Sequence, residues 1–297
     1  MQIPEPRLRH VTCASATSLH RMAYWEWGPQ QGTSNRFGAP PLGTIVCVHG
    51  LTRNGRDFDA LAAHLSSRWR VVCPDIVGRG QSDRLADPRQ YVVPQYVADC
   101  VTLIARLDVE RVTWVGTSMG GLIGMVLAAL PGSPIERLVL NDIGPLLDTD
   151  GLARIGSYVG QDPSFASRAQ ALAALRELMR SFGPHSDEQF ELLARHFLVQ
   201  RGDRWGYNYD PNIAVPFRET TGGTAGDLWP FYDAIKCPTL VLRGAESDLL
   251  SEATARQMTE RGPRAELVEF AGVGHAPTLI AAEQIEAVER FLPQEHA

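Results

Sequence analysis

The feature that most constrains the fold is a strand-like run that ends at a serine between two glycines. Residues 112–120 read VTWVGTSMG, and an apolar run of helix length follows over residues 121–130. This order fits the G-x-S-x-G pattern, in which a sharp strand-to-helix turn lifts the serine out of a sheet. Side chains in place of Gly116 or Gly120 would collide where strand and helix meet. The pattern predicts Ser118 as a nucleophile; the alternative is an ordinary glycine-rich turn.

Strand-like apolar runs alternate with helical patterns on both sides of this turn. The strand-like runs lie at residues 22–28, 44–48, 69–73, 112–115, 135–140, 238–244 and 265–270. Helical patterns lie at residues 58–65, 94–107, 252–261 and 283–291. This alternation predicts an α/β fold with a mostly parallel central sheet flanked by helices on both faces.

The alternation stops between residues 146 and 230. This segment carries helical patterns at 168–182 and 187–199 and has no confident buried strand. We therefore predict a helical cap over residues 146–230, inserted into a core made of residues 1–145 and 231–297.

Composition and charge exclude several classes of function. The 297 residues carry a formal charge of −6 and no basic block, which argues against a nucleic-acid partner. The five cysteines are scattered without a C-x-x-C pair, so neither a zinc site nor a redox site is indicated. The sequence shows no run of 18 apolar residues and no apolar leader, so we expect a cytoplasmic protein without a membrane partner.

A serine nucleophile needs a base, and the base needs an orienting acid. His275 is the predicted base, because it follows the last strand in a glycine-rich loop. Two acids compete for the third position. Asp248 follows the strand at 238–244 and is the preferred choice, whereas Asp142 follows the strand at 135–140 and is the alternative. Both satisfy the chain order serine, acid, histidine.

The oxyanion of a tetrahedral intermediate needs two backbone N–H groups. We predict one from Met119, which follows the serine at a helix N-terminus, where the helix dipole helps. The other is predicted from Leu51, in the turn after the strand that ends at His49 and Gly50. His49 itself is interpreted as a residue that hydrogen-bonds the backbone and shapes this turn.

Some polar and aromatic residues are candidates for a substrate pocket. Arg53 lies near the predicted mouth, where it either binds a substrate carboxylate or pairs with Asp57 or Asp59. Aromatic side chains that either line an acyl pocket or pack inside the cap include Trp205, Tyr207 and Trp229.

Together these motifs resemble the α/β-hydrolase fold family, and in particular its capped bacterial esterase and lactonase branch. The resemblance rests on His49-Gly50, Asp75 to Asp83, Gly116 to Gly120, Gly244 to Asp248 and Gly274-His275. It implies the Ser-Asp-His set described above. Members that are dehalogenases or epoxide hydrolases use aspartate where this chain has Ser118. The ring-cleavage C–C hydrolases usually carry tryptophan where Ala276 follows the histidine.

The sequence thus predicts a serine hydrolase that cleaves a small carboxylic ester or lactone through an acyl-enzyme. Neither a metal nor an organic cofactor is expected, and the expected partner is the small-molecule substrate. Two alternatives stay open. The same residues could hydrolyse C–C or amide bonds or carry out perhydrolysis, and the fold could serve as a small-molecule receptor.

Overall fold

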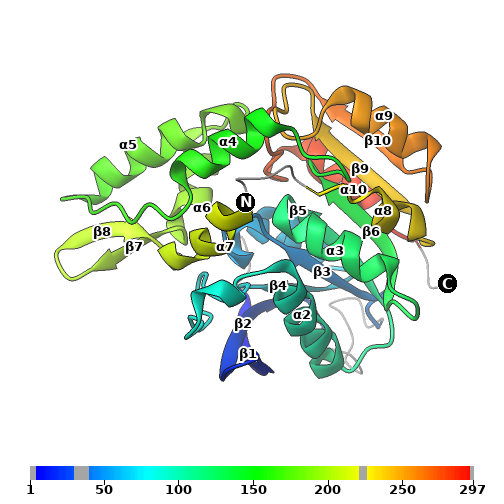
Figure 1. Cartoon of the computed structure of the whole chain (residues 1–297), viewed down its shortest axis with the longest axis horizontal. Coiled ribbons are helices and arrows are strands. Elements are labelled where there is room, and N and C mark those ends of the chain that lie inside the picture. Colours follow the sequence, from blue (N-terminus) through cyan, green and yellow to red (C-terminus); the bar gives the residue numbers. More distant parts are fainter. Residues whose placement is uncertain (1–4, 30–39, 221–225, 295–297) are drawn as a thin grey trace.

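The computed structural model describes residues 5–29, 40–220 and 226–294, and its centre is a mixed sheet (Figure 1). The strands follow the order β1-β2-β4-β3-β5-β6-β9-β10. They are β1 (Arg7–Ala14), β2 (Leu19–Trp27), β3 (Thr44–Val48), β4 (Arg70–Pro74), β5 (Val112–Thr117), β6 (Ile135–Asn141), β9 (Thr239–Gly244) and β10 (Glu266–Phe270). β2 pairs antiparallel with β1 and β4, whereas the other neighbours are parallel. The predicted mostly parallel sheet is confirmed.

Helices cover both faces of this sheet (Figure 1). They are α1 (Asp59–Leu65), α2 (Val93–Leu107), α3 (Met119–Ala129), α8 (Trp229–Ala234), α9 (Glu252–Glu260) and α10 (Ala282–Phe291), with short 3-10 turns η1 (Gly55–Phe58) and η2 (Pro88–Gln90). Successive side chains of β3 point to opposite faces of the sheet. Ile45 and Cys47 share an apolar cluster with α1 and α10, whereas Val46 and Val48 share one with α2 and α3. Because both faces are covered, nearly every side chain of such a strand is apolar, and its sequence is a near-continuous apolar run.

The order of the sheet reverses at β3, because β4 lies on one side of it and β5 on the other. In open α/β sheets, the loops diverge at such a point and leave a crevice at the carboxyl ends of the strands. His49 follows β3 and Ser118 follows β5. The topology therefore places both predicted site segments at this crevice.

Between β6 and α8 the chain leaves the sheet, and we call residues 146–230 the inserted segment. It holds α4 (Thr149–Tyr158), α5 (Arg168–Leu178), η3 (Arg180–Phe182), α6 (Asp187–Arg195), β7 (Leu198–Arg201), β8 (Arg204–Tyr207), η4 (Pro211–Ile213) and α7 (Ala214–Thr220). From the sequence we expected helices and no confident buried strand over this segment. It also contains strands, because β7 and β8 form an antiparallel hairpin. Gly202 closes that hairpin at φ +64°, a conformation that glycine adopts without strain. In Figure 1 α4 and α5 lie together at one end of the sheet.

Candidate active site

Ser118 sits on the turn between β5 and α3 with φ 51° and ψ −113°, a strained conformation for a residue other than glycine. A Cβ atom on Gly116 would lie 2.3 Å from the carbonyl oxygen of Gly120. A Cβ atom on Gly120 would lie 1.9 Å from the carbonyl oxygen of Val48. The two glycines therefore let strand, turn and helix approach closely enough to hold the serine in this conformation.

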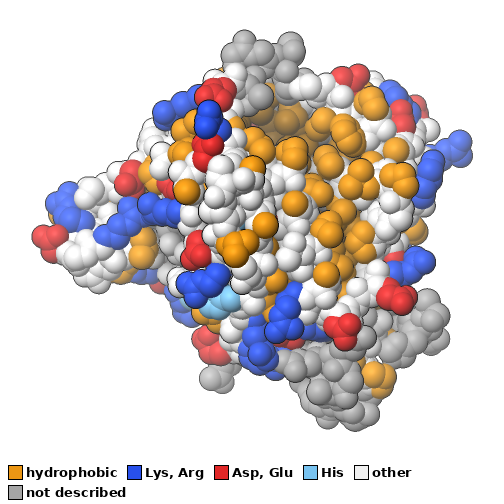
Figure 2. Space-filling model, turned by 60° about the horizontal axis from the view of Figure 1, so that its bottom comes forward, with side chains coloured by type: hydrophobic (Ala, Val, Ile, Leu, Met, Phe, Trp, Pro, Cys, Tyr) orange, Lys and Arg blue, Asp and Glu red, His pale blue; other side chains and the backbone are white. Residues whose placement is uncertain are grey.

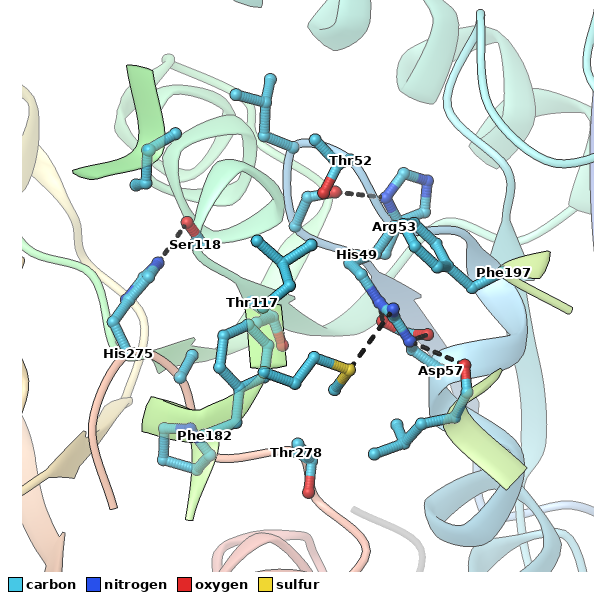
Figure 3. Close-up of a pocket in the computed structure, with 18 of the residues that line it drawn as sticks. His49, Thr52, Arg53, Asp57, Thr117, Ser118, Phe182, Phe197, His275 and Thr278 are labelled. Carbon is cyan, nitrogen blue, oxygen red and sulfur yellow. Dashed lines mark hydrogen bonds and ion pairs between the residues drawn. The ribbon is translucent and has the colours of Figure 1, made fainter. Parts of the chain in front are cut away.

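The structure brings Ser118 and His275 together, as Figure 3 shows. His275 lies in the loop after β10, and its Nε2 is 2.9 Å from the Ser118 Oγ. Both side chains are buried. Hydrogen-bond contact between a hydroxyl and an imidazole is the arrangement from which a base can take the serine proton.

Asp142, the alternative acid, lies on the other side of the imidazole. Its Oδ2 is 2.8 Å from the Nδ1 of His275. The carboxylate also accepts a hydrogen bond from the Gly244 N–H at 2.8 Å and from the Ser247 hydroxyl at 2.6 Å. These donors fix the carboxylate, which in turn fixes the imidazole with its Nδ1–H toward Asp142.

The preference for Asp248 as the acid that orients His275 is wrong, because the structure places Asp142 against the imidazole instead. The Asp248 carboxylate instead forms a two-point ion pair with Arg154 of α4, with Oδ1 2.7 Å from Nη2. Hydrogen bonds from this guanidinium lower the pKa of Asp248 below its usual value. The main chain around Asp248 packs against the same helix, since its carbonyl accepts from the Gly151 N–H at 3.1 Å. Asp248 thus anchors the inserted segment to the core.

Ser247 is a site residue that the sequence interpretation missed. Its hydroxyl donates to Asp142 and accepts from the N–H groups of Leu249 and Leu250, at 3.2 and 3.1 Å. Asn141 is a second one, because its amide donates to Thr117 at 2.9 Å and to the Pro277 carbonyl at 2.8 Å. The available signal was their place next to the candidate acids at strand ends.

The turn after β3 is held by His49, as predicted. The Ile76 N–H donates to His49 Nε2 at 3.0 Å, so Nδ1 carries the proton and donates to the Gly50 carbonyl at 2.7 Å. This turn is tied to the elbow, because the Gly120 N–H donates to the His49 carbonyl at 3.1 Å. Within the described residues, the N–H groups of Leu51 and Met119 donate no hydrogen bond. Both therefore keep a free donor beside Ser118 for the predicted oxyanion.

Two histidines, the buried His49 and the half-buried His196, make stability depend on pH. Desolvation, with nearby arginine charges, lowers the pKa of His49 from 6.5 to about 3 and that of His196 to about 4. Below pH 6.5 the unfolded chain protonates these groups while the folded chain does not. We expect the free energy of unfolding to fall toward pH 4 by about 1.4 kcal/mol per pH unit for each such group. Urea titrations should show a weaker fall in His196→Asn, and an unchanged slope would contradict the assignment.

Two cavities flank Ser118. The first, which we call the histidine-side cavity, has a volume of about 70 Å³ and is lined by His275, Thr278, Arg53, Tyr158 and Phe197 among others (Figure 3). The second, which we call the apolar cavity, has a volume of about 350 Å³, and its walls include Leu122, Ile143, Leu152 and Ile213. Leu51 and Ser118 line both. The larger volume falls within the range of small-molecule sites, about 300–1,000 Å³.

Arg53 reaches the histidine-side cavity with its charge already paired. Its Nε and Nη2 donate to the two Asp57 carboxylate oxygens at 2.7 and 2.6 Å, and its guanidinium lies 4.4 Å from the Phe197 ring centroid. The pairing with Asp57, one of the two sequence interpretations, is the one observed, whereas Asp59 binds Arg56. A substrate carboxylate would therefore meet a neutralised cation.

The three aromatic residues proposed for an acyl pocket lie outside both cavities. Trp205 bridges to Phe165 within the inserted segment, and Tyr207 packs against Phe197 with ring centroids 4.8 Å apart. Trp229 begins α8 and packs edge-on against Tyr232. The pocket expectation was wrong for these residues because their rings have packing partners inside the protein.

Among the described residues, a possible metal-binding group is the buried set Cys13, His20 and Asp99. His20 Nε2 already binds the Asp99 carboxylate at 2.9 Å, and burial raises the pKa of the Cys13 thiol to about 12. A metal needs the thiolate, so the contacts favour a structural hydrogen-bonded cluster.

The outer surface was searched for features of membrane or nucleic-acid binding. Within the described ranges, no helix is long and apolar enough to cross a bilayer. On the face shown in Figure 2, basic and acidic side chains are interspersed around apolar patches and form no continuous basic surface.

The comparisons with known proteins agree with the fold described above. A family model described as alpha/beta hydrolase fold matches residues 43–281. A 3-hydroxybutyrate-oligomer hydrolase of Cupriavidus necator is 50% identical over 294 residues, which cover 96% of this chain and 97% of that protein. The esterase YbfF of Escherichia coli is 28% identical over 256 residues, 84% of this chain and 91% of the esterase.

Among solved structures, an alpha/beta hydrolase from Novosphingobium aromaticivorans superposes with a TM-score of 0.85 at 38% identity. The match covers 98% of this chain and 99% of the other. The sheet order, the serine turn and the family match all lead to one assignment. The chain belongs to the alpha/beta hydrolase fold family and is a hydrolase of that fold.

Proposed function

We propose that this hydrolase is a serine esterase acting through an acyl-enzyme, and that its substrates are short oligoesters of the 3-hydroxybutyrate kind. The hydrogen-bonded series Ser118, His275, Asp142 carries the proposal of mechanism. The 50% identity to the oligomer hydrolase, over nearly the whole of both chains, supports the proposal of substrate.

In the proposed reaction, the Ser118 Oγ attacks the ester carbonyl while its proton passes to His275 Nε2. The N–H groups of Leu51 and Met119 stabilise the tetrahedral oxyanion. Collapse breaks the ester bond, and His275 returns the proton to the leaving alkoxide. Water then attacks the acyl-enzyme with His275 again as base, which releases the acid and restores Ser118. Asp142 holds the imidazole tautomer and stabilises its cation in both steps.

The two cavities suggest how an oligoester would lie. The leaving alcohol must contact His275, which lines only the smaller cavity, so we assign that cavity to the alcohol side. The acyl side then falls in the apolar cavity, whose described walls hold no charged side chain. Burying a carboxylate there would be costly. The hydroxyl-terminal units therefore occupy the apolar cavity, and the carboxylate-terminal units leave from the histidine side.

We also propose that the inserted segment acts as the cap of this site. Ile155 and Tyr158 of α4 line the histidine-side cavity together with Phe197, which precedes β7. The Arg154–Asp248 ion pair ties α4 to the loop after β9. A cap held in this way limits the size and shape of the alcohol portion that the histidine-side cavity admits.

A substrate panel tests the proposal. We expect hydrolysis of 3-hydroxybutyrate dimers and trimers and of p-nitrophenyl 3-hydroxybutyrate. We expect kcat/KM for the p-nitrophenyl monoester of succinic acid, which carries a carboxylate on its acyl side, to be at least about 10-fold lower than for p-nitrophenyl butyrate. Turnover of anilides or diketones without turnover of esters would contradict the proposed function. A preference for the succinate ester would contradict the assignment of the acyl side.

A further inference from the structure

Arg79 is a buried cation without a carboxylate partner. Its side chain is 1% exposed. Its Nε donates to the Leu51 carbonyl at 2.8 Å, and its Nη1 donates to the Val77 carbonyl at 2.7 Å and to the Tyr96 hydroxyl at 3.1 Å. The described residues hold no carboxylate oxygen within 4.0 Å of this guanidinium. Its acceptors are therefore neutral groups.

The other buried arginines of the described chain differ in this respect. Each of them contacts a carboxylate, in the pairs Arg53–Asp57, Arg56–Asp59, Arg70–Glu26 and Arg243–Glu269. Removing a charge from water without compensation is expensive, and the cost is usually met by an opposite charge. The Tyr96 and Tyr91 rings, with centroids 5.1 and 5.8 Å from the Arg79 guanidinium carbon, supply only partial compensation. The unpaired charge therefore needs a reason.

The position of the charge supplies that reason. Arg79 contacts both residues that are proposed to bind the oxyanion, through the Leu51 carbonyl and through the Met119 Sδ, 3.5 Å from Nη2. Its charge also contributes to lowering the pKa of His49, which shapes the same turn. A cation in a dry, low-dielectric wall interacts strongly with a negative charge that forms nearby.

We propose that Arg79 is a positioning residue for the oxyanion: it fixes the Leu51 turn and Met119, and its uncompensated charge favours the tetrahedral intermediate. This inference rests on the proposed serine-esterase function. A structural role alone would require the hydrogen bonds of the guanidinium but not its unpaired charge.

The test compares Arg79→Met, which removes the charge, with Arg79→Lys, which keeps it. Arg70→Met is the matched control, since Arg70 is also buried but lies at the opposite end of the sheet strands. We expect Arg79→Met to lower kcat about 10- to 100-fold with little change in KM, and Arg79→Lys to recover most of the loss. Arg70→Met should lower the melting temperature without changing kcat per folded molecule. If Arg79→Met does not fold, Arg79→Gln against Arg79→Lys makes the same comparison.

Two ketones separate charge from structure. A trifluoromethyl ketone forms an anionic adduct on the serine, whereas the matching methyl ketone binds without one. Loss of the charge should weaken the trifluoromethyl ketone by the same factor as kcat and leave the methyl ketone unchanged. Equal losses for both ketones, wild-type kcat in folded Arg79→Met, or a lysine variant as poor as the methionine variant would each overturn the inference.

A fluorophosphonate keeps this test distinct from the test of function, because phosphonylation of Ser118 needs no ester substrate. If the wild type is labelled but hydrolyses no ester, the proposed function fails. A labelling rate at least about 10-fold lower in Arg79→Met than in Arg79→Lys would then still support the role of the charge. Equal labelling rates would overturn it, and a wild type that is not labelled at all would overturn both proposals.

Discussion

Substitution Ser118→Ala should lower kcat for ester hydrolysis by about 10³- to 10⁶-fold. The loss is large because every proposed covalent step passes through the Ser118 Oγ, and His275 then has no hydroxyl proton to accept. The fold should survive, since Ser118 already adopts its strained backbone conformation without help from a side-chain cap. The measurement is steady-state hydrolysis of p-nitrophenyl 3-hydroxybutyrate, with the melting temperature as a check on folding.

Ser133→Ala is a suitable control, because Ser133 lies in the turn between α3 and β6, away from the carboxyl ends of the strands. Its activity should match the wild type. Retention of a tenth or more of wild-type kcat in folded Ser118→Ala would contradict the assignment of the nucleophile, since it leaves a loss of less than about 10-fold.

Substitution Asp142→Asn should lower kcat on the order of 10³- to 10⁴-fold, whereas Asp248→Asn should lower it less than about 10-fold. An amide at position 142 can donate its own N–H to the imidazole, which favours the wrong tautomer of His275 and removes the charge that stabilises its cation. Asp248 contacts Arg154 instead, so its loss should loosen α4 and lower the melting temperature.

The two aspartates provide controls for each other. Both follow strands of the sheet, both carry one charge, and only Asp142 touches the imidazole. Steady-state kinetics of both variants beside thermal unfolding separates a catalytic from a stability effect. A larger fall in kcat for Asp248→Asn than for Asp142→Asn would show that the contacts seen here are not those of the active enzyme.

Sequence alone was sufficient to predict the parallel strands of the sheet and the tight glycine-flanked turn at Ser118. Buried parallel strands such as β3 and β5 are recognisable in the sequence as short apolar runs. The glycines around Ser118 indicate a close approach of backbone segments that a residue with a side chain would prevent. β1 was not among the predicted strands, because its first four residues are exposed and its polar pattern is typical of a loop. The β7–β8 hairpin was missed for a similar reason, since the last two residues of β7, Gln200 and Arg201, are exposed.

The choice between the two aspartates depends on contacts far apart in the chain. Asp142 and Asp248 each follow a strand, and local sequence does not show where their side chains point. The direction is set by Gly244 and Ser247, about a hundred residues after Asp142, and by Arg154 on the inserted segment. Sequence spacing carries no information about these partners.

The pocket was predicted least well because aromatic composition does not separate a ligand wall from a packed core. Tyr207 packs between other rings of the inserted segment, whereas Phe197 and Tyr158 reach the histidine-side cavity. Arg53 similarly depends on one turn of η1, which brings Asp57 against its guanidinium. Such partnerships follow from tertiary packing.

The central claim is that Ser118 is the nucleophile of an acyl-transfer site. Its most direct test is mass spectrometry of the wild-type protein after reaction with a fluorophosphonate, with the adduct mapped by peptide sequencing and residual ester hydrolysis measured in parallel. We expect one phosphonyl group per chain, on Ser118, and loss of hydrolysis in proportion to labelling. A label on another residue, or full hydrolysis by fully labelled protein, would contradict it.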